Sequence, residues 1–216
     1  MKLHKEAFPT VFYAAVIYAL SILGVWRLFH AHKTVYTIWF WVATILLLVT
    51  FWFFRKPVKK SYRQPDACIS PAFGRILTIE KCVENNYLKC ECLCISIFMS
   101  PLNVHVNYIP IDGDVAHVKH HTGNYLLAFH PKASSKNEHV NSVISGKVDV
   151  LVKQIAGFFA RRIVNYMHEG SNVQQGDELG FIKWGSRTQV YLPLTAKINV
   201  AVGDIVRGGQ TVLAFF

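Results

Sequence analysis

The segment EGSNVQQGDEL, residues 169–179, recurs as VGDIVRGGQTV, residues 202–212, at an offset of 33 positions. The matched pairs are Gly170 with Gly203, Val173 with Val206, Gly176 with Gly209 and Leu179 with Val212. Glycine accepts the positive φ angles that tight turns require, so each copy predicts a strand, a glycine turn and a second strand. Two such units facing each other predict a small sandwich of β-hairpins.

Short apolar runs of β-type residues, separated by Gly, Pro and Asn, extend this pattern through the rest of residues 66–216. They cover residues 75–79, 92–98, 148–155, 189–192 and 211–215. Periodicity leaves residues 156–166 open between helix and strand. The predicted class is therefore mostly β.

The first 54 residues have a different composition. Residues 8–26 and 35–54 contain no formal charge, and about 20 apolar residues suffice to span a membrane. A single run of this kind could be a buried core helix, but two, with Trp and Tyr near their ends, predict a transmembrane helical hairpin. With a mean hydropathy of +0.26 and only 17% charged residues, the composition excludes a disordered chain. The expected organisation is a hairpin over 1–54, a basic linker over 55–65 and one β domain over 66–216.

Basic residues predict the orientation of this hairpin. The linker 55–65 carries five Lys and Arg residues, whereas the loop between the two runs carries Arg27 and Lys33. The positive-inside rule then places the β domain and the N-terminus on the cytoplasmic side of the cell membrane. A formal net charge of +10 also admits nucleic acid as a partner, but no nucleic-acid-binding motif accompanies the basic cluster, so none is expected.

The chain has five cysteines, at positions 68, 82, 90, 92 and 94. Cys90, Cys92 and Cys94 alternate, which places them on one face of a strand. Their spacing is shorter than that of zinc ligands and no second ligand pair follows, so we expect no metal site. Small buried apolar side chains are the favoured interpretation, and a cytoplasmic location argues against disulfides.

The repeat resembles the barrel-sandwich fold of lipoyl and biotinyl carrier domains. In such carriers, the hairpin between the two repeats presents a cofactor-bearing lysine at its tip. Here that tip falls at Gly185-Ser186, so the resemblance does not favour a carrier. A Gly-Ser pair is most often an ordinary turn. A serine after a flexible glycine can also attack the preceding carbonyl, and the resulting ester can eliminate to give a pyruvoyl group, an electron sink.

Five stretches also resemble the short, archaeal-type phosphatidylserine decarboxylase family. They are ISPAxG (69–74), SIFMSPLNVHVN (96–107), GNYLLAFHPKASxxNE (123–138), QIAGxxARRIV (154–164) and GFIKWGSR (180–187). They occur in family order across 66–216. The resemblance implies self-cleavage between Gly185 and Ser186 into chains 1–185 and 186–216, with Ser186 becoming the pyruvoyl cofactor. The ketone would form a Schiff base with phosphatidylserine, whose decarboxylation gives phosphatidylethanolamine.

The same resemblance implies roles for other side chains. His105 is the candidate proton donor after decarboxylation, although the pattern alone fits a structural histidine equally well. The candidate contacts to phosphate or carboxylate, each as readily ordinary surface charge, are Arg161, Arg162, Lys132 and His130. The implied partners are phosphatidylserine, membrane lipid and the chain's own small fragment, and a homo-oligomer is left open.

Two residues depart from the family pattern. Phe73 stands where the family has an aspartate that assists self-processing, and Tyr108 stands where longer bacterial members have a second histidine. We therefore expect a decarboxylase that can be impaired in processing. The alternative is an unprocessed, non-catalytic, membrane-tethered barrel-sandwich module that binds lipid or a partner protein.

Overall fold

The computed structural model describes residues 2–29, 32–57, 63–124, 126, 136–157, 162–183 and 185–216. The chain forms two compact units, Met1–Val58 and Lys59–Phe216, and the division falls inside the basic linker expected over 55–65.

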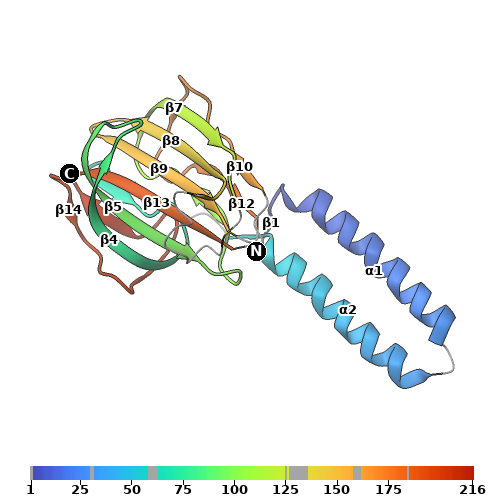
Figure 1. Cartoon of the computed structure of the whole chain (residues 1–216). Coiled ribbons are helices and arrows are strands. Elements are labelled where there is room, and N and C mark those ends of the chain that lie inside the picture. The colour runs from blue at the N-terminus through green and yellow to red at the C-terminus, as the bar shows by residue number, and fades with distance from the viewer. Residues whose placement is uncertain are drawn as a thin grey trace. The chain divides into compact units, whose positions relative to one another are not determined.

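The first unit is a helical hairpin. Helices α1 (Ala7–Phe29) and α2 (Lys33–Phe53) run antiparallel (Figure 1), and strands β1 (Lys2–Leu3) and β2 (Arg55–Lys56) pair at its open end. Between the helices, the Tyr18 hydroxyl lies 3.2 Å from Thr44 Oγ1. Both helices are long and apolar enough to cross a membrane, which confirms the predicted two-helix hairpin.

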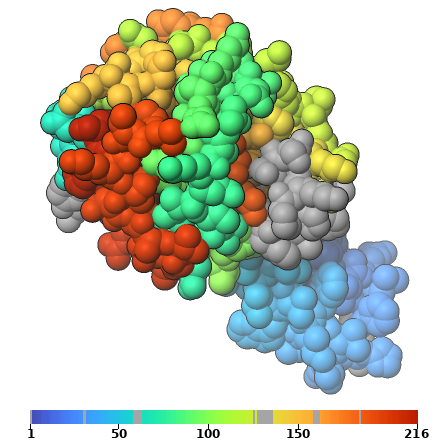
Figure 2. Space-filling model, turned by 60° about the vertical axis from the view of Figure 1, so that its left-hand side comes forward, coloured from blue at the N-terminus to red at the C-terminus, as the bar shows by residue number. Residues whose placement is uncertain are grey.

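The second unit is built around one antiparallel sheet of eight strands (Figure 1). Its order is β11–β7–β8–β9–β13–β5–β4–β15. The strand bounds are β4 Gly74–Glu84, β5 Cys90–Met99, β7 Gly113–His121, β8 His139–Ser145, β9 Asp149–Ala156, β11 Asn172–Val173, β13 Ser186–Pro193 and β15 Ile205–Val206. The pairing of β4 with β15 brings the C-terminal segment beside the β4–β5 hairpin, as Figure 2 shows.

Two three-stranded sheets complete the unit. One has the order β10–β12–β6 and the other β14–β16–β3. Their bounds are β3 Ala67–Ile69, β6 Val106–Tyr108, β10 Ile163–Asn165, β12 Glu178–Ile182, β14 Lys197–Ile198 and β16 Val212–Phe215. The predicted mostly β class is confirmed, and all five strands expected from apolar runs overlap strands of the structure.

The sequence repeat is also a structural repeat. Its first copy forms β11 and β12, and its second forms β15 and β16. Strands β11 and β15 occupy opposite edges of the large sheet, while β12 and β16 are the central strands of the small sheets. The repeat glycines Gly170, Gly176, Gly203 and Gly209 have φ angles of 80°, 79°, 96° and 73°, which confirms the predicted turns.

The hydrophobic core covers one face of the large sheet. Alternate residues such as Ile97 on β5, Val152 on β9 and Val190 on β13 point into it and are fully buried. Burying one such side chain stabilises the fold by about 1.5–3 kcal/mol. The opposite face of this sheet, which we call the second face, carries the intervening residues.

Three local expectations need correction or completion. Gly185-Ser186 is not the tip of a hairpin, because the strands that flank it, β12 and β13, belong to different sheets. Within residues 156–166, the structure has the strand β10, and 158–161 lie outside the described residues. Cys92 and Cys94 are buried as predicted, but Cys90 is exposed because it opens β5 beside the hairpin turn.

Candidate active site

The Gly185-Ser186 peptide lies where a turn enters a central strand. Ser186 is the first residue of β13, pairs with Met99 on β5 and Ala156 on β9, and is fully buried. Gly185 has a φ of +68°, a left-handed conformation that favours glycine. A Cβ at this position would meet only Pro101 Cγ, at 3.7 Å, so the backbone conformation rather than crowding requires a glycine.

The Gly185 carbonyl group accepts a hydrogen bond from the residue that follows the neighbouring strand β9. The amide N–H of Gly157, which follows β9, donates to this oxygen over 3.1 Å. A donor placed there would stabilise negative charge that develops on the oxygen during nucleophilic attack on the Gly185 carbonyl carbon. The Gly185 amide faces a different partner, and donates to His105 Nε2 over 3.3 Å.

His105 is fully buried in the segment between β5 and β6. Its Nδ1 lies 2.9 Å from the carbonyl oxygen of Asn103, which can only accept, so Nδ1 carries the proton. The other ring nitrogen, Nε2, is then the acceptor for the Gly185 amide. The structure therefore brings His105 and the Gly185-Ser186 peptide together, with an unprotonated ring nitrogen directed at Gly185.

The Ser186 hydroxyl donates to a thioether. Its Oγ lies 3.2 Å from Met99 Sδ, which also lies 3.6 Å from Thr188 Oγ1 and 3.7 Å from Asn107 Nδ2. Asn107 in turn accepts from Gln154 Nε2 over 2.8 Å. This buried network holds the start of β13. Sulfur is a weak acceptor, so leaving it costs the hydroxyl little.

Sequence reasoning assigned no role to Met99, Asn107, Gln154 or Gly157. All four lie inside motifs by which the sequence resembles the decarboxylase family, in 96–107 and 154–164. Their place in those motifs was the available signal. Which of them face Ser186, however, depends on the strand register.

Of the four predicted substrate contacts, only Arg162 is among the described residues. His130, Lys132 and Arg161 lie outside the described residues. Arg162 is exposed just before β10 and lines a cavity of about 480 Å³ together with His120 and Glu138. His120 Nε2 and Glu138 Oε1 lie 2.9 Å apart there. The substrate-binding roles therefore stay predictions.

Comparison with known proteins identifies the family. The phosphatidylserine decarboxylase family model matches residues 46–214. The chain belongs to the phosphatidylserine decarboxylase family. It is 42% identical to the phosphatidylserine decarboxylase proenzyme of Amoebophilus asiaticus, covering 99% of this chain and 96% of that protein. The proenzyme of Cytophaga hutchinsonii is 39% identical over 100% of this chain and 99% of its own, and that of Nitrosomonas europaea is 43% identical over 82% and 84%.

The two residues that the sequence analysis singled out as departures, Phe73 and Tyr108, are neighbours in space. The rings of Phe73 and Tyr108 pack edge to face, with centroids 6.1 Å apart. Burial raises the pKa of Tyr108, so its phenol stays neutral and cannot serve as a base. The Phe73 carbonyl accepts from Asn103 Nδ2 over 3.2 Å, and the Asn103 carbonyl accepts from His105. Position 73 is thus linked through Asn103 to the histidine beside Gly185.

Among the described residues, no three His, Cys, Asp or Glu side chains come together in a way that could hold a metal ion. The cysteine sulfurs of Cys82 and Cys92 lie 3.5 Å apart across β4 and β5 as free thiols.

Proposed function

We propose that this chain is a phosphatidylserine decarboxylase whose pyruvoyl cofactor is made from Ser186 by self-cleavage. The observation that carries the proposal is the environment of the Gly185-Ser186 peptide. The Gly157 amide donates to the carbonyl that must be attacked, and His105 lies beside the same glycine. Family membership over nearly the full chain supports the same conclusion.

Cleavage uses the chain's own atoms. Ser186 Oγ attacks the Gly185 carbonyl carbon, its proton passes to a base, and the oxygen that becomes negative stays bonded to the Gly157 amide. The C–N bond then breaks as Ser186 N takes a proton, which leaves an ester. Loss of the Ser186 α-proton expels Gly185 as a carboxylate. The dehydroalanine left at position 186 tautomerises and is hydrolysed with release of ammonia.

The residues around Ser186 suit the formation of a pyruvoyl group only in part. Gly157, His105 and the weakly held Ser186 hydroxyl suit its formation, whereas Phe73 supplies no carboxylate. When formed, a pyruvoyl group supplies the electron sink that makes loss of carbon dioxide from a bound amino acid feasible. His105, buried and adjacent, is placed in this proposal to hold the proton that replaces the carboxylate.

The membrane arrangement is part of the same proposal. In this proposal α1 and α2 anchor the chain in the cell membrane, and the excess of Lys and Arg after α2 supports a cytoplasmic location for the β unit. A lipid substrate requires such proximity to a bilayer. After cleavage, chains 1–185 and 186–216 stay associated.

The test is Ser186→Ala in the full chain, with Ser171→Ala as a matched control in a loop. The parent and the control should migrate as two chains on a denaturing gel and release carbon dioxide from carboxyl-labelled phosphatidylserine. Ser186→Ala should do neither, because alanine has no hydroxyl to attack Gly185. A single-chain parent that releases no carbon dioxide would favour the alternative of an unprocessed lipid-binding module. Carbon dioxide release by Ser186→Ala would refute the pyruvoyl mechanism.

A further inference from the structure

The second face of the large sheet holds sheltered polar side chains among buried apolar ones such as Leu151 and Ile155. Ser96 is 1% exposed, Asn141 4%, Gln189 5% and Arg187 7%. Register places them side by side, because Gln189 pairs with Ser96 on β5 and with Lys153 on β9, which pairs with Asn141 on β8. A solvated sheet face would expose such side chains, so this arrangement is typical of a site lining.

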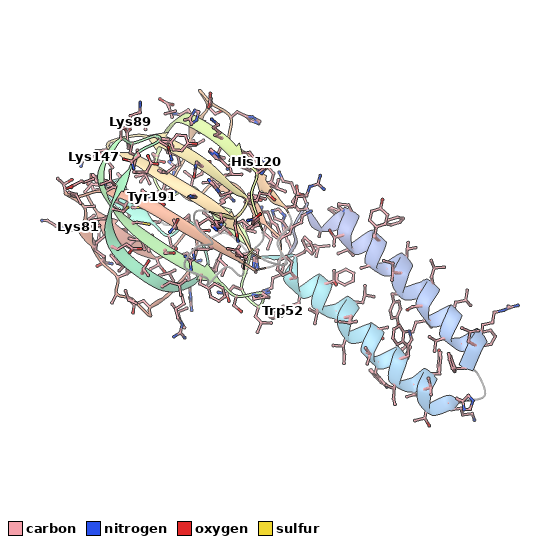
Figure 3. The ribbon with its side chains drawn as sticks, in the orientation of Figure 1. Trp52, Lys81, Lys89, His120, Lys147 and Tyr191 are labelled. Carbon is pink, nitrogen blue, oxygen red and sulfur yellow. The ribbon has the colours of Figure 1, made fainter. Side chains whose placement is uncertain are left out.

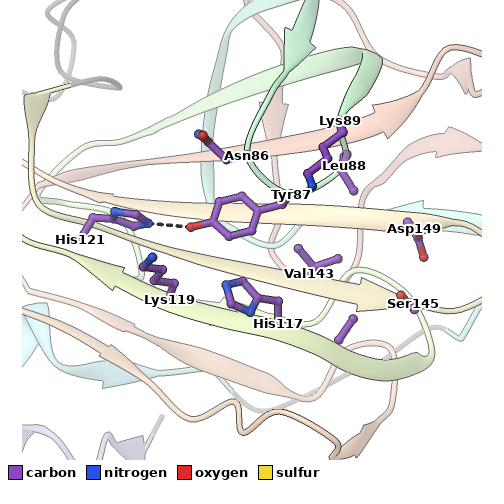
Figure 4. Close-up of a pocket in the computed structure, with 11 residues that line it drawn as sticks. Asn86, Tyr87, Leu88, Lys89, His117, Lys119, His121, Val143, Ser145 and Asp149 are labelled. Carbon is purple, nitrogen blue, oxygen red and sulfur yellow. Dashed lines mark hydrogen bonds between the residues drawn. The ribbon is translucent and has the colours of Figure 1, made fainter.

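Part of the shelter comes from the tip of the β4–β5 hairpin. The Tyr87 hydroxyl lies 2.6 Å from His121 Nε2 on β7, and its ring lies 5.0 Å from that of His117 (Figure 4). Beneath the tip is a cavity of about 610 Å³ that Lys89 and Lys119 also line. The second face thus ends in an open, basic cavity.

Three buried polar side-chain atoms have no hydrogen-bond partner among the described residues, and all three lie on the second face. They are Ser96 Oγ, Asn141 Oδ1 and Arg187 Nε. A buried donor or acceptor left unpaired costs about 1–3 kcal/mol, and a guanidinium costs more. Of the three, Ser96 Oγ and Arg187 Nε can donate to a polar ligand, whereas Asn141 Oδ1 can only accept.

The charge of the second face defines that ligand as an anion. Arg187 and Lys153 form no ion pair with any described residue, and burial lowers the pKa of both. Nearby carboxylates have other roles. Glu84 accepts three amides of the hairpin turn over 2.7–3.2 Å, and Glu80 is exposed and bonded to Thr78. The two cations therefore have no direct ion-pair partner among the described residues, although the charge of Glu84 acts on Lys153 and that of Glu80 on Arg187.

We propose that Arg187, with Lys153 beside it, binds the phosphodiester of the phospholipid headgroup. This proposal rests on the proposed function, because Arg187 directly follows Ser186 and consecutive Cα atoms are about 3.8 Å apart. The two side chains leave β13 on opposite faces, so a headgroup whose amine reacts at position 186 must reach round the start of β13 to bring its phosphate to Arg187. In phosphatidylserine only Cα, Cβ and the ester oxygen separate the reacting amine from phosphorus. A guanidinium fork matches phosphate oxygens bidentately. A cation held on the carboxylate would instead stabilise the ground state that must lose carbon dioxide.

Binding can be tested without turnover in the full chain carrying Ser186→Ala, in a neutral detergent. Glycerophosphoserine is titrated by calorimetry against this parent and against parents that also carry Arg187→Gln, Arg187→Lys or Lys153→Gln. Arg187→Gln should weaken binding about 10- to 100-fold, and the other two should weaken it less. The matched control Lys81→Gln removes an exposed charge from β4 (Figure 3) and should bind within about twofold of the parent.

The outcomes separate the sources of the anion. No binding by the parent, or equal binding by Arg187→Gln, overturns the proposal. Inorganic phosphate that binds as tightly as glycerophosphoserine overturns the headgroup assignment, and free L-serine that does so assigns the site to the carboxylate instead. If Arg187→Gln does not fold, the proposal is judged on Lys153→Gln, and binding equal to that of the parent would overturn it. Failure of the proposed function appears separately, as an uncleaved, inactive wild-type chain.

Discussion

At the scale of single residues, an aromatic pair, Phe73 and Tyr108, lies where the sequence resemblance implies an aspartate that assists self-cleavage. Phe73 contributes neither charge nor a side-chain hydrogen bond, and its neighbour Tyr108 is a neutral phenol in a buried position. The nucleophile, Ser186, is a weak one unless a base accepts its proton. Maturation of this chain should therefore be limited by its own substitutions.

Phe73→Asp should accelerate self-cleavage, and Phe73→Leu should not. The backbone carbonyl of residue 73 accepts from the Asn103 side chain, and the Asn103 carbonyl in turn fixes His105, so the substitution is made close to that histidine. General-base assistance contributes about 10²–10⁴-fold, so an increase toward that range is expected in a time course of the 1–185 and 186–216 chains. Because Tyr108 is buried, circular dichroism must show that the variant folds. A folded Phe73→Asp that cleaves at the parent rate would remove position 73 from this step.

Gly185→Ala tests the left-handed turn at the scissile peptide, with Gly203→Ala as its control. Both glycines have positive φ, and neither Cβ would meet a close contact. Each variant should lose about 1–2 kcal/mol of unfolding free energy, measured in urea in the Ser186→Ala background. Only Gly185→Ala should also slow cleavage with Ser186 restored, since it shifts the carbonyl relative to Gly157. Equal cleavage rates for the two would show that the turn geometry is not needed.

At the scale of elements, strands were easier to predict than their pairing. Spacing alone predicted the glycine turns of the repeat, because positive φ is a local requirement. Ser186 was expected at a hairpin tip, but it begins β13, a central strand of the large sheet. Ser186 is buried because β5 and β9 pair with β13 on either side, and the sequence alone does not show that pairing. The donor at Gly157 could not be predicted either, because it faces Gly185 only in one register.

Strands β7 and β8 carry a pH-sensitive pair. His139 stacks on His121 at 4.6 Å, and burial, followed by the charge of Lys153, lowers the pKa of His139 from 6.5 to about 4. The folded state therefore binds fewer protons than the unfolded state between these values. The stability from neutral His139 is complete above about pH 6.5 and is lost as the pH falls toward 4.

Replacing His139 isolates that contribution. In the Ser186→Ala background, the unfolding free energy of the parent should fall as the pH is lowered from 6.5 to 4. In His139→Gln this fall should be smaller by about 1–2 kcal/mol, after allowance for solvent screening. Denaturation series at several pH values measure the difference. His168→Gln, an exposed histidine, is the control. Parallel pH curves for parent and His139→Gln would contradict the assignment.

At the scale of the whole molecule, the division into two units predicts that the β unit folds alone. Removal of residues 1–54 deletes α1 and α2 and leaves the core cluster intact. The truncated chain should be soluble, give a β-type circular dichroism spectrum and cleave at the parent rate. Its activity should fall on phosphatidylserine in vesicles more than on a short-chain analogue, because only the former needs a membrane anchor. Aggregation or loss of β structure would place the boundary elsewhere.

The central position of β13 affects how the protein folds before cleavage and how it could reassemble afterwards. The strand is paired along its length with β5 on one side and β9 on the other, so a cut before its first residue would leave it in place. One chain would then have become two that no covalent bond joins. Precursor folding is unimolecular, but reassembly of the cut pair would be bimolecular and would have to insert a strand between two others. Dilution leaves the precursor's stability unchanged, whereas it would lower that of the mature pair. Assembly before the cut is therefore expected to be easier than reassembly of the two separated chains.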